Sequence, residues 1–191
     1  MNLIYIFIMY TDLNIIIPCK NEAKNLEFII PKLLQYCDDI TVVDGNSKDE
    51  TEEICKKFNV TFVKDNNLGK GDAQRVGASL TKKKYLIFFD ADGSHEETDV
   101  PKLYNKINED SIDLVICSRK TGGSHDLISN TSWGGFVRAV GTDFLSILLN
   151  KLFKTRISDV LYSLKAIEKE KFDKLETKEN HFGIELDIIL Q

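Results

Sequence analysis

Short apolar runs alternate with longer amphipathic segments along most of the chain. Runs of four or five apolar residues, each followed by a polar turn, predict buried strands. They are Leu13–Ile17, Ile40–Val43, Val60–Val63, Tyr85–Phe89 and Leu114–Cys117. The segments between them have apolar residues at helical spacing, and these are Ala23–Tyr36, Lys48–Phe58, Gly71–Leu80 and Asp99–Asn108.

This alternation predicts an α/β fold, a Rossmann-like, doubly wound and mainly parallel sheet flanked by helices. Ser47 with Glu50 has the spacing of a capping box, and Pro101 suits the first turn of the helix that follows it. In such sheets, ligands bind beyond the carboxyl ends of the strands. The segments at those ends are polar: Pro18–Glu22, Asp44–Ser47, Lys64–Asn66 and Asp90–Asp92.

The alternation weakens after Cys117. Residues 121–135 contain many Gly and Ser residues and predict a long loop. Further elements are expected at Phe136–Phe153 (helix), Tyr162–Ile167 (strand) and Ile184–Leu190 (helix). Because the last helix has no C-terminal cap, we expect residues 13–191 to form one domain whose end is truncated.

The first ten residues are apolar but number only about half of the roughly 20 that a membrane-spanning helix needs. They also lack the basic start and the cleavage site of a signal peptide. We therefore expect residues 1–12 to be an N-terminal extension or an interfacial anchor.

Charge and cysteine content exclude several classes of protein. Lys and Arg number 25 against 30 Asp and Glu, a formal net charge of -5, so no broad positive surface is available for nucleic acid. The four cysteines are far apart and form no C-x-x-C pair, which argues against a zinc site and against a disulfide framework. We expect reduced thiols, as in the cytoplasm.

The segment Asp90-Ala91-Asp92 follows an apolar strand. Two carboxylates at this spacing can converge on one hard cation where a strand breaks into a turn, and Mg²⁺ or Mn²⁺ prefers such oxygen ligands. An acidic turn without a metal is the alternative. The polar turns after the first two strands would lie at the same edge and could complete a nucleotide site.

The order of these segments resembles that of family-2 glycosyltransferases with the GT-A fold. The matching patterns are IIPxxNE, VVDxxSxDxT, GKGxAxRxG, DADxxH and SR, within Ile15–Asn25, Val42–Thr51, Leu68–Gly77, Asp90–His95 and Asp113–Arg119. Within the family, this order is most similar to dolichyl-phosphate mannosyltransferases and other polyprenyl-phosphate hexosyltransferases. The resemblance implies that residues 13–191 are a catalytic domain.

The resemblance also implies roles for individual residues. Seven of them would bind the donor: Pro18, Asn21, Glu22, Asp44, Lys70, Arg75 and Asp90. Asp90 and Asp92 would hold the metal, and Asp92 would also be catalytic. Arg119 and Arg138 look like the arginines that bind the acceptor phosphate, a role that suits the guanidinium fork. Asp159 aligns with a segment near the acceptor.

Members of this family invert the anomeric centre in a single displacement. A polyprenyl phosphate is already anionic, so positioning by Arg119 would matter more than a base. A saccharide hydroxyl acceptor would need a base, for which Asp159 is the candidate, and a non-catalytic nucleotide-sugar binder is a third possibility. The lipid acceptor implies a peripheral position at the cytoplasmic face of a membrane.

Overall fold

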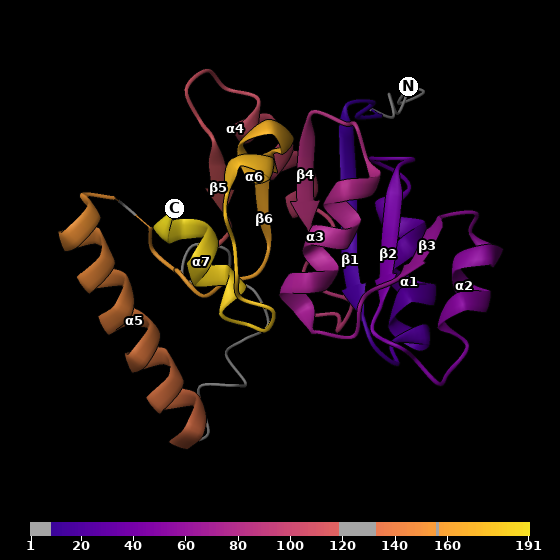
Figure 1. Ribbon diagram of the computed structural model, residues 1–191, viewed down its shortest axis with the longest axis horizontal. Coiled ribbons are helices and arrows are strands. Elements are labelled where there is room, and N and C mark those ends of the chain that lie inside the picture. Colours follow the sequence, from indigo (N-terminus) through magenta and orange to yellow (C-terminus); the bar gives the residue numbers. More distant parts are fainter. Residues whose placement is uncertain (1–8, 119–132, 156) are drawn as a thin grey trace, which may run out of the picture.

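A sheet with the strand order β3-β2-β1-β4-β6-β5 lies at the centre of the molecule (Figure 1). The computed structural model describes residues 9–118, 133–155 and 157–191, without the side chains of residues 133–140. The strands are β1 (Leu13–Cys19), β2 (Ile40–Asp44), β3 (Thr61–Lys64), β4 (Tyr85–Phe88), β5 (Leu114–Ile116) and β6 (Lys165–Glu168).

The sheet is mainly parallel, as predicted. β1 pairs in parallel with β2 on one side and with β4 on the other, and β2 pairs in parallel with β3. β6 alone among these strands runs the other way, antiparallel to both β4 and β5. It begins at Lys165, three residues later than the predicted strand at Tyr162. The chain order reverses between β1 and β4, so a crevice for ligands is expected there.

Helices cover both faces of the sheet. They are α1 (Ala23–Leu33), α2 (Thr51–Lys57), α3 (Lys70–Leu80), α4 (Asp99–Ile107), α6 (Lys169–Lys174) and α7 (Ile184–Leu190). A further helix, α5 (Trp133–Phe153), stands apart from the sheet (Figure 1). Side chains of β1 alternate between the two faces: Ile15 and Ile17 share a core with α1 and α4, whereas Ile16 packs with α3, α6 and α7. This accounts for the apolar run Ile15–Ile17 in β1, since both faces of the strand are buried.

The close approach of α3 to the sheet depends on Gly77. A Cβ atom at this position would lie 2.6 Å from Cγ2 of Ile16 and 3.0 Å from Cγ2 of Val43. Any larger residue would force α3 away from β1 and β2. The N-terminus of this helix, with Lys70, is thereby held beside the carboxyl ends of the strands.

The predicted capping box at Ser47 is wrong. Helix α2 begins at Thr51 rather than at Lys48, and no side chain caps it from Glu50. The hydroxyl of Ser47 instead accepts a hydrogen bond from the backbone N–H of Asn21, 2.7 Å away. Ser47 therefore joins the turn after β2 to the turn after β1. The predicted position of Pro101 in the first turn of α4 is confirmed.

Residues just before β1 pack against the same core. The ring of Tyr10 stacks on that of Tyr104 with centroids 3.9 Å apart, and the Tyr104 hydroxyl donates to Asp12 at 2.6 Å. Part of the predicted extension is thus attached to α4, while residues 1–8 lie outside the described residues.

Candidate active site

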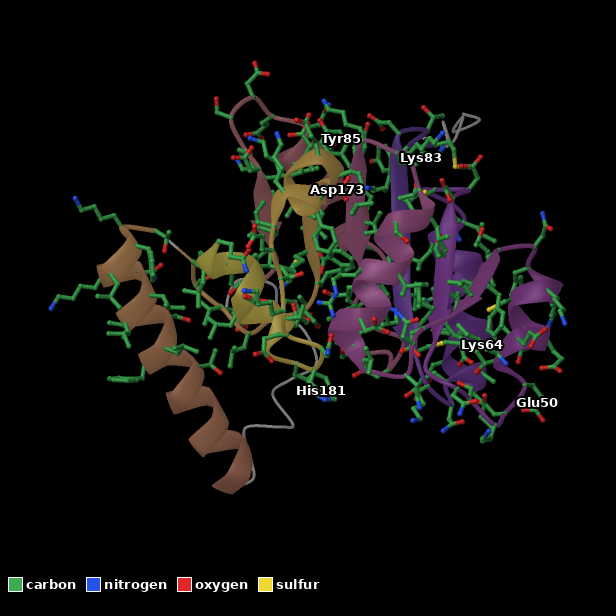
Figure 2. All side chains as sticks on the ribbon, viewed as in Figure 1. Glu50, Lys64, Lys83, Tyr85, Asp173 and His181 are labelled. Carbon is green, nitrogen blue, oxygen red and sulfur yellow. The ribbon has the colours of Figure 1, made fainter. Side chains whose placement is uncertain are left out.

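A cleft of about 470 Å³ opens at the carboxyl ends of the parallel strands. Its walls come from the segments after β1, β2, β3 and β4, from the start of α3, and from the loop before α7. In Figure 2, His181 of that loop lies at this end of the sheet, whereas Lys83 and Tyr85, near the start of β4, lie at the other. The cleft thus lies where a doubly wound sheet is expected to bind ligands.

Asp90 and Asp92 both line this cleft. Strand β4 ends at Phe88, and Gly93 has a φ of 78°, a left-handed conformation that glycine adopts without strain. Ala91, between the two aspartates, is buried in the core. The turn therefore directs two carboxylates to one side, as the i, i+2 spacing predicted. One oxygen of Asp92 accepts a hydrogen bond from the backbone N–H of Ser94 at 3.0 Å.

The carboxylate of Asp90 is held by three side chains. Nζ of Lys70 lies 2.6 Å from its Oδ1, the hydroxyl of Ser163 donates to its Oδ2 at 2.5 Å, and Nε2 of His95 lies 3.6 Å from Oδ2. Burial by itself raises the pKa of Asp90, but the bond from His95 and the charge of Lys70 outweigh it, so this pKa falls well below its usual range. Asp90 is therefore ionised at neutral pH.

Lys70 also belongs to a deeper set of charges. Its Nζ lies 3.0 Å from Oε1 of Glu185, and Oε2 of Glu185 forms an ion pair with Lys165. Lys165 on β6 is fully buried, and Glu185 on α7 is nearly so. Burial lowers the pKa of Lys165, while the charge of Glu185 opposes that shift. Four alternating charges, here called the charge ladder, run from the core to the cleft: Lys165, Glu185, Lys70 and Asp90.

The loop before α7 is docked on the start of α3. The guanidinium of Arg75 donates to the carbonyl oxygen of Glu179 at 2.9 Å and to the side chain of Asn180. The N–H of Gly71 donates to the carbonyl oxygen of Asn180 at 2.8 Å, and a side chain at Gly71 would collide with this loop. These contacts place His181 in the cleft wall.

The structure brings together five of the predicted site residues. Those that line the cleft are Pro18, Glu22, Lys70, Asp90 and Asp92. Three others support its surroundings instead. Arg75 holds the loop described above. Asn21 accepts a hydrogen bond from the N–H of Lys48 at 2.7 Å, and the buried Asp44 accepts one from the N–H of Ser47 at 3.1 Å.

Of the predicted acceptor residues, Asp159 is not among the residues that line this cleft. Asp159 is only 2% exposed and lines a separate cavity of about 710 Å³ beside β5. Arg119 and the side chain of Arg138 lie outside the described residues.

Four residues of the site were missed by the sequence interpretation. Lys165 and Glu185 stand within apolar segments, and charged residues in such places are seldom buried unless paired, so this pattern was a usable signal. His181 and Phe182, which line the cleft, had no such signal, because tertiary contacts from Arg75 place them there.

All four cysteines are free, as predicted. Cys19 lines the cleft, and burial raises the pKa of its thiol far above the usual range. Burial likewise raises the pKa of Cys37 and of Cys117 to about 12. Since the thiolate is the nucleophile, these neutral thiols are poor nucleophiles.

The cleft suits a hard divalent cation that shares its ligands with a substrate. Among residues 9–118, 133–155 and 157–191, no group of three or more His, Cys, Asp or Glu side chains forms a closed metal cage. Asp92 offers carboxylate oxygen at the cleft surface. Mg²⁺ characteristically binds one or two carboxylates and completes its coordination with water and substrate phosphates, so this site fits such an ion.

Comparisons with known proteins agree with this geometry. The model of the family described as glycosyl transferase family 2 matches residues 14–176. The human dolichyl-phosphate beta-glucosyltransferase is 30% identical over 119 residues, which cover 51% of this chain and 36% of that protein. Glycosyltransferase AglJ of Haloferax volcanii is 26% identical over 184 residues, covering 93% of this chain and 57% of that protein. The chain spans about half the length of several curated relatives that it matches.

A solved structure shares the fold. Glucosyl-3-phosphoglycerate synthase from Mycobacterium tuberculosis, in complex with Mn²⁺, uridine diphosphate and glucosyl-3-phosphoglycerate, superposes with a TM-score of 0.71 at 19% identity. The alignment covers 93% of this chain and 63% of that one. The predicted GT-A fold is thereby confirmed.

We expect Arg75→Ala to loosen the loop before α7 without unfolding the sheet, because two hydrogen bonds to residues 179 and 180 are lost. Amide hydrogen exchange at Gly71, whose N–H is bonded to this loop, should accelerate roughly tenfold or more, while exchange in β1 stays unchanged. Arg75→Lys keeps the charge but not the fork and should give an intermediate rate. Wild-type exchange at Gly71 in Arg75→Ala would show that other contacts hold the loop.

Proposed function

Since the chain belongs to glycosyl transferase family 2, we propose that it transfers a hexose from a nucleoside diphosphate sugar to a polyprenyl phosphate. The single observation that carries this proposal is the convergence of Lys70, Asp90 and Asp92 on one cleft at the switch point of the sheet. Lys70 supplies a positive charge for a sugar diphosphate, and the two aspartates supply carboxylates that can hold the metal ion bound to it.

We assign the diphosphate to the part of the cleft between Asp92 and Lys70. Asp92, whose recorded bond comes from a backbone N–H, is the more accessible metal ligand. Asp90 would contribute to the same ion only by sharing its charge with Lys70, 2.6 Å away. The bound Mg²⁺ or Mn²⁺ would supply charge neutralisation for the departing diphosphate.

The nucleoside is assigned to the opposite end of the cleft. Pro18 lies near the end of β1, Glu22 follows this strand, and Gly45 and Asp65 follow β2 and β3. This wall therefore combines apolar surface with carboxylates that can accept hydrogen bonds from ribose or base. Asn21 and Asp44 act here through the turns that they hold. Substitution of Asp44 would change the shape of the cleft wall and would not remove a direct contact to the nucleoside.

The proposed reaction is one inverting displacement. A lone pair of the acceptor oxygen forms a bond to C1 of the sugar while the bond from C1 to the diphosphate oxygen breaks, and its electrons leave with the nucleoside diphosphate. An anionic phosphate acceptor needs no proton removed. Asp159, the expected base for a hydroxyl acceptor, lies in a different cavity, and this favours the phosphate.

Helix α5 supports a lipid acceptor, because its polarity is the reverse of that of a helix on a protein surface. In its described part, Thr142 and Ser146 are buried, whereas Phe144 and Ile147 are each 68% exposed and Leu152 is 64% exposed. Lys151 and Lys154 are exposed at its end. The helix stands apart from the sheet at the left of Figure 1. An apolar face beside cations fits the interface of an anionic membrane.

Among the described residues, no helix has the length and apolar character needed to cross a bilayer. From the exposed apolar face of α5, we propose that this helix lies in the membrane surface and that the reaction takes place at the cytoplasmic face. The names of the relatives that act with dolichyl phosphate support this assignment.

We expect Asp92→Asn to lower kcat for sugar transfer by roughly a hundredfold to a thousandfold, the scale of a lost group that stabilises transition-state charge. Its free energy of unfolding should stay near the wild-type value, because Asp92 lies at the cleft surface. Radiolabelled transfer to a short polyprenyl phosphate, with Mn²⁺ present, measures the rate. The matched control is Asp110→Asn, at an exposed position outside the cleft, and equal rates for both variants would remove Asp92 from the mechanism.

We expect the double variant Phe144→Asp/Ile147→Asp to bind anionic vesicles at least about tenfold more weakly, since each side chain contributes about 2 kcal/mol when it leaves water. Co-sedimentation with phosphatidylglycerol vesicles at low and high salt measures the partition. Phe28→Asp removes an equally exposed phenylalanine from α1, 65% exposed, and should leave binding unchanged. If the wild-type chain fails to bind vesicles and transfers the hexose to a soluble saccharide, the lipid acceptor is excluded and a saccharide hydroxyl replaces it.

A further inference from the structure

The charge ladder continues well behind the cleft surface. Lys70, whose side chain is 11% exposed, lies between two carboxylates, at 2.6 Å from Asp90 and at 3.0 Å from Glu185. Glu185 is in turn shared between Lys70 and Lys165, and neither Glu185 nor Lys165 reaches the cleft. Two formal positive charges therefore balance two negative ones.

Stability alone does not account for this ladder. Burying charges is costly, and replacing a buried ion pair by apolar side chains of similar volume is often neutral or stabilising. Lys165 lies on the same face of β6 as Ile167 and in register with Phe88 of β4, and both of these belong to the apolar core that also contains Ile184 of α7. An apolar pair would fit here, so the charges point to a role for the group at the outer end, Lys70.

We propose that Lys165 is a positioning residue: by neutralising Glu185, it keeps the charge of Lys70 available to the diphosphate of the donor. Lys165 neutralises Glu185, and Glu185 therefore attracts Lys70 only in part. Lys70 is then free to turn from Asp90 to an incoming diphosphate while Glu185 retains hold of its other side. This inference rests on the proposed function, because it assumes that a diphosphate enters this cleft.

The charges predict an asymmetry between variants. In Lys165→Met, Glu185 has Lys70 as its only ion-pair partner in the ladder, so Lys70 is withdrawn from the cleft and donor binding weakens. In Glu185→Gln, the two ion pairs of Glu185 are broken. Lys70 then no longer has a second carboxylate that competes with the diphosphate for its charge, so donor binding does not weaken. Purely structural support would give the opposite order, since Glu185→Gln removes two ion pairs and Lys165→Met removes one.

The test measures the Kd of uridine diphosphate and of guanosine diphosphate, each with Mn²⁺, by calorimetry on the full chain. For the nucleotide that binds the wild-type chain, we expect Lys165→Met to raise Kd about tenfold, as expected for one unit charge acting over several ångströms at intermediate dielectric. We expect Glu185→Gln and the double variant Lys165→Met/Glu185→Gln to stay within about threefold of wild type. The control Lys106→Met removes an exposed lysine of α4 and should have no effect.

Recovery of the wild-type Kd when Glu185→Gln is added to Lys165→Met is a result that a purely structural role does not give. If the double variant binds as weakly as Lys165→Met, or if Glu185→Gln is the weakest variant, the inference is overturned while the proposed function stands. If the wild-type chain binds neither nucleotide, the proposed function fails and the inference with it. Thermal unfolding of each variant reports on folding. If Lys165→Met does not fold, Lys165→Gln, which removes the charge but keeps a hydrogen-bond donor for Glu185, takes its place with the same expected rise in Kd.

Discussion

The ion pair between Lys70 and Asp90 connects the two parts of the fold that make the cleft. Lys70 begins α3, which packs on β1 and β2, and Asp90 follows β4 on the other side of the switch point. Gly77 allows α3 to lie close enough for this contact, and Glu185 ties the same lysine to α7. A compact cleft with opposed charges results, and the assignment of a sugar diphosphate to it follows from those charges.

Much of the fold could be predicted from the sequence, because β1, β2 and β4 are buried on both faces and are therefore mainly apolar runs. The turn Asp90–Asp92 by itself was equally compatible with an acidic turn without a metal, and the order of the surrounding motifs made it a candidate site. The reversed direction of β6 was not predictable. A short strand at Lys165 carries no signal of its neighbours, which long-range pairing to β4 and β5 decides.

The parts of the site that depend on long-range contacts in the fold could not be predicted from the sequence. Glu22 was identified from its place after the first strand and Lys70 from the family resemblance, whereas Asn21 and Ser47 form a bond across 26 residues that no local pattern encodes. His181 enters the cleft through a contact that Arg75 makes 104 residues along the chain. The capping box failed for the same reason: Ser47 had a tertiary partner that was more favourable than its own helix.

The central claim is that this cleft binds a nucleoside diphosphate sugar together with a divalent cation. Thermal unfolding of the wild-type chain with a panel of uridine and guanosine diphosphate sugars, with and without Mn²⁺, tests it most directly, because a ligand that binds only the native state raises Tm. The account predicts that at least one sugar nucleotide raises Tm by several degrees, about what 2 to 3 kcal/mol of binding gives a domain of this size, and only when Mn²⁺ is present. No shift with any member of the panel, or an equal shift in the presence of EDTA, would contradict it.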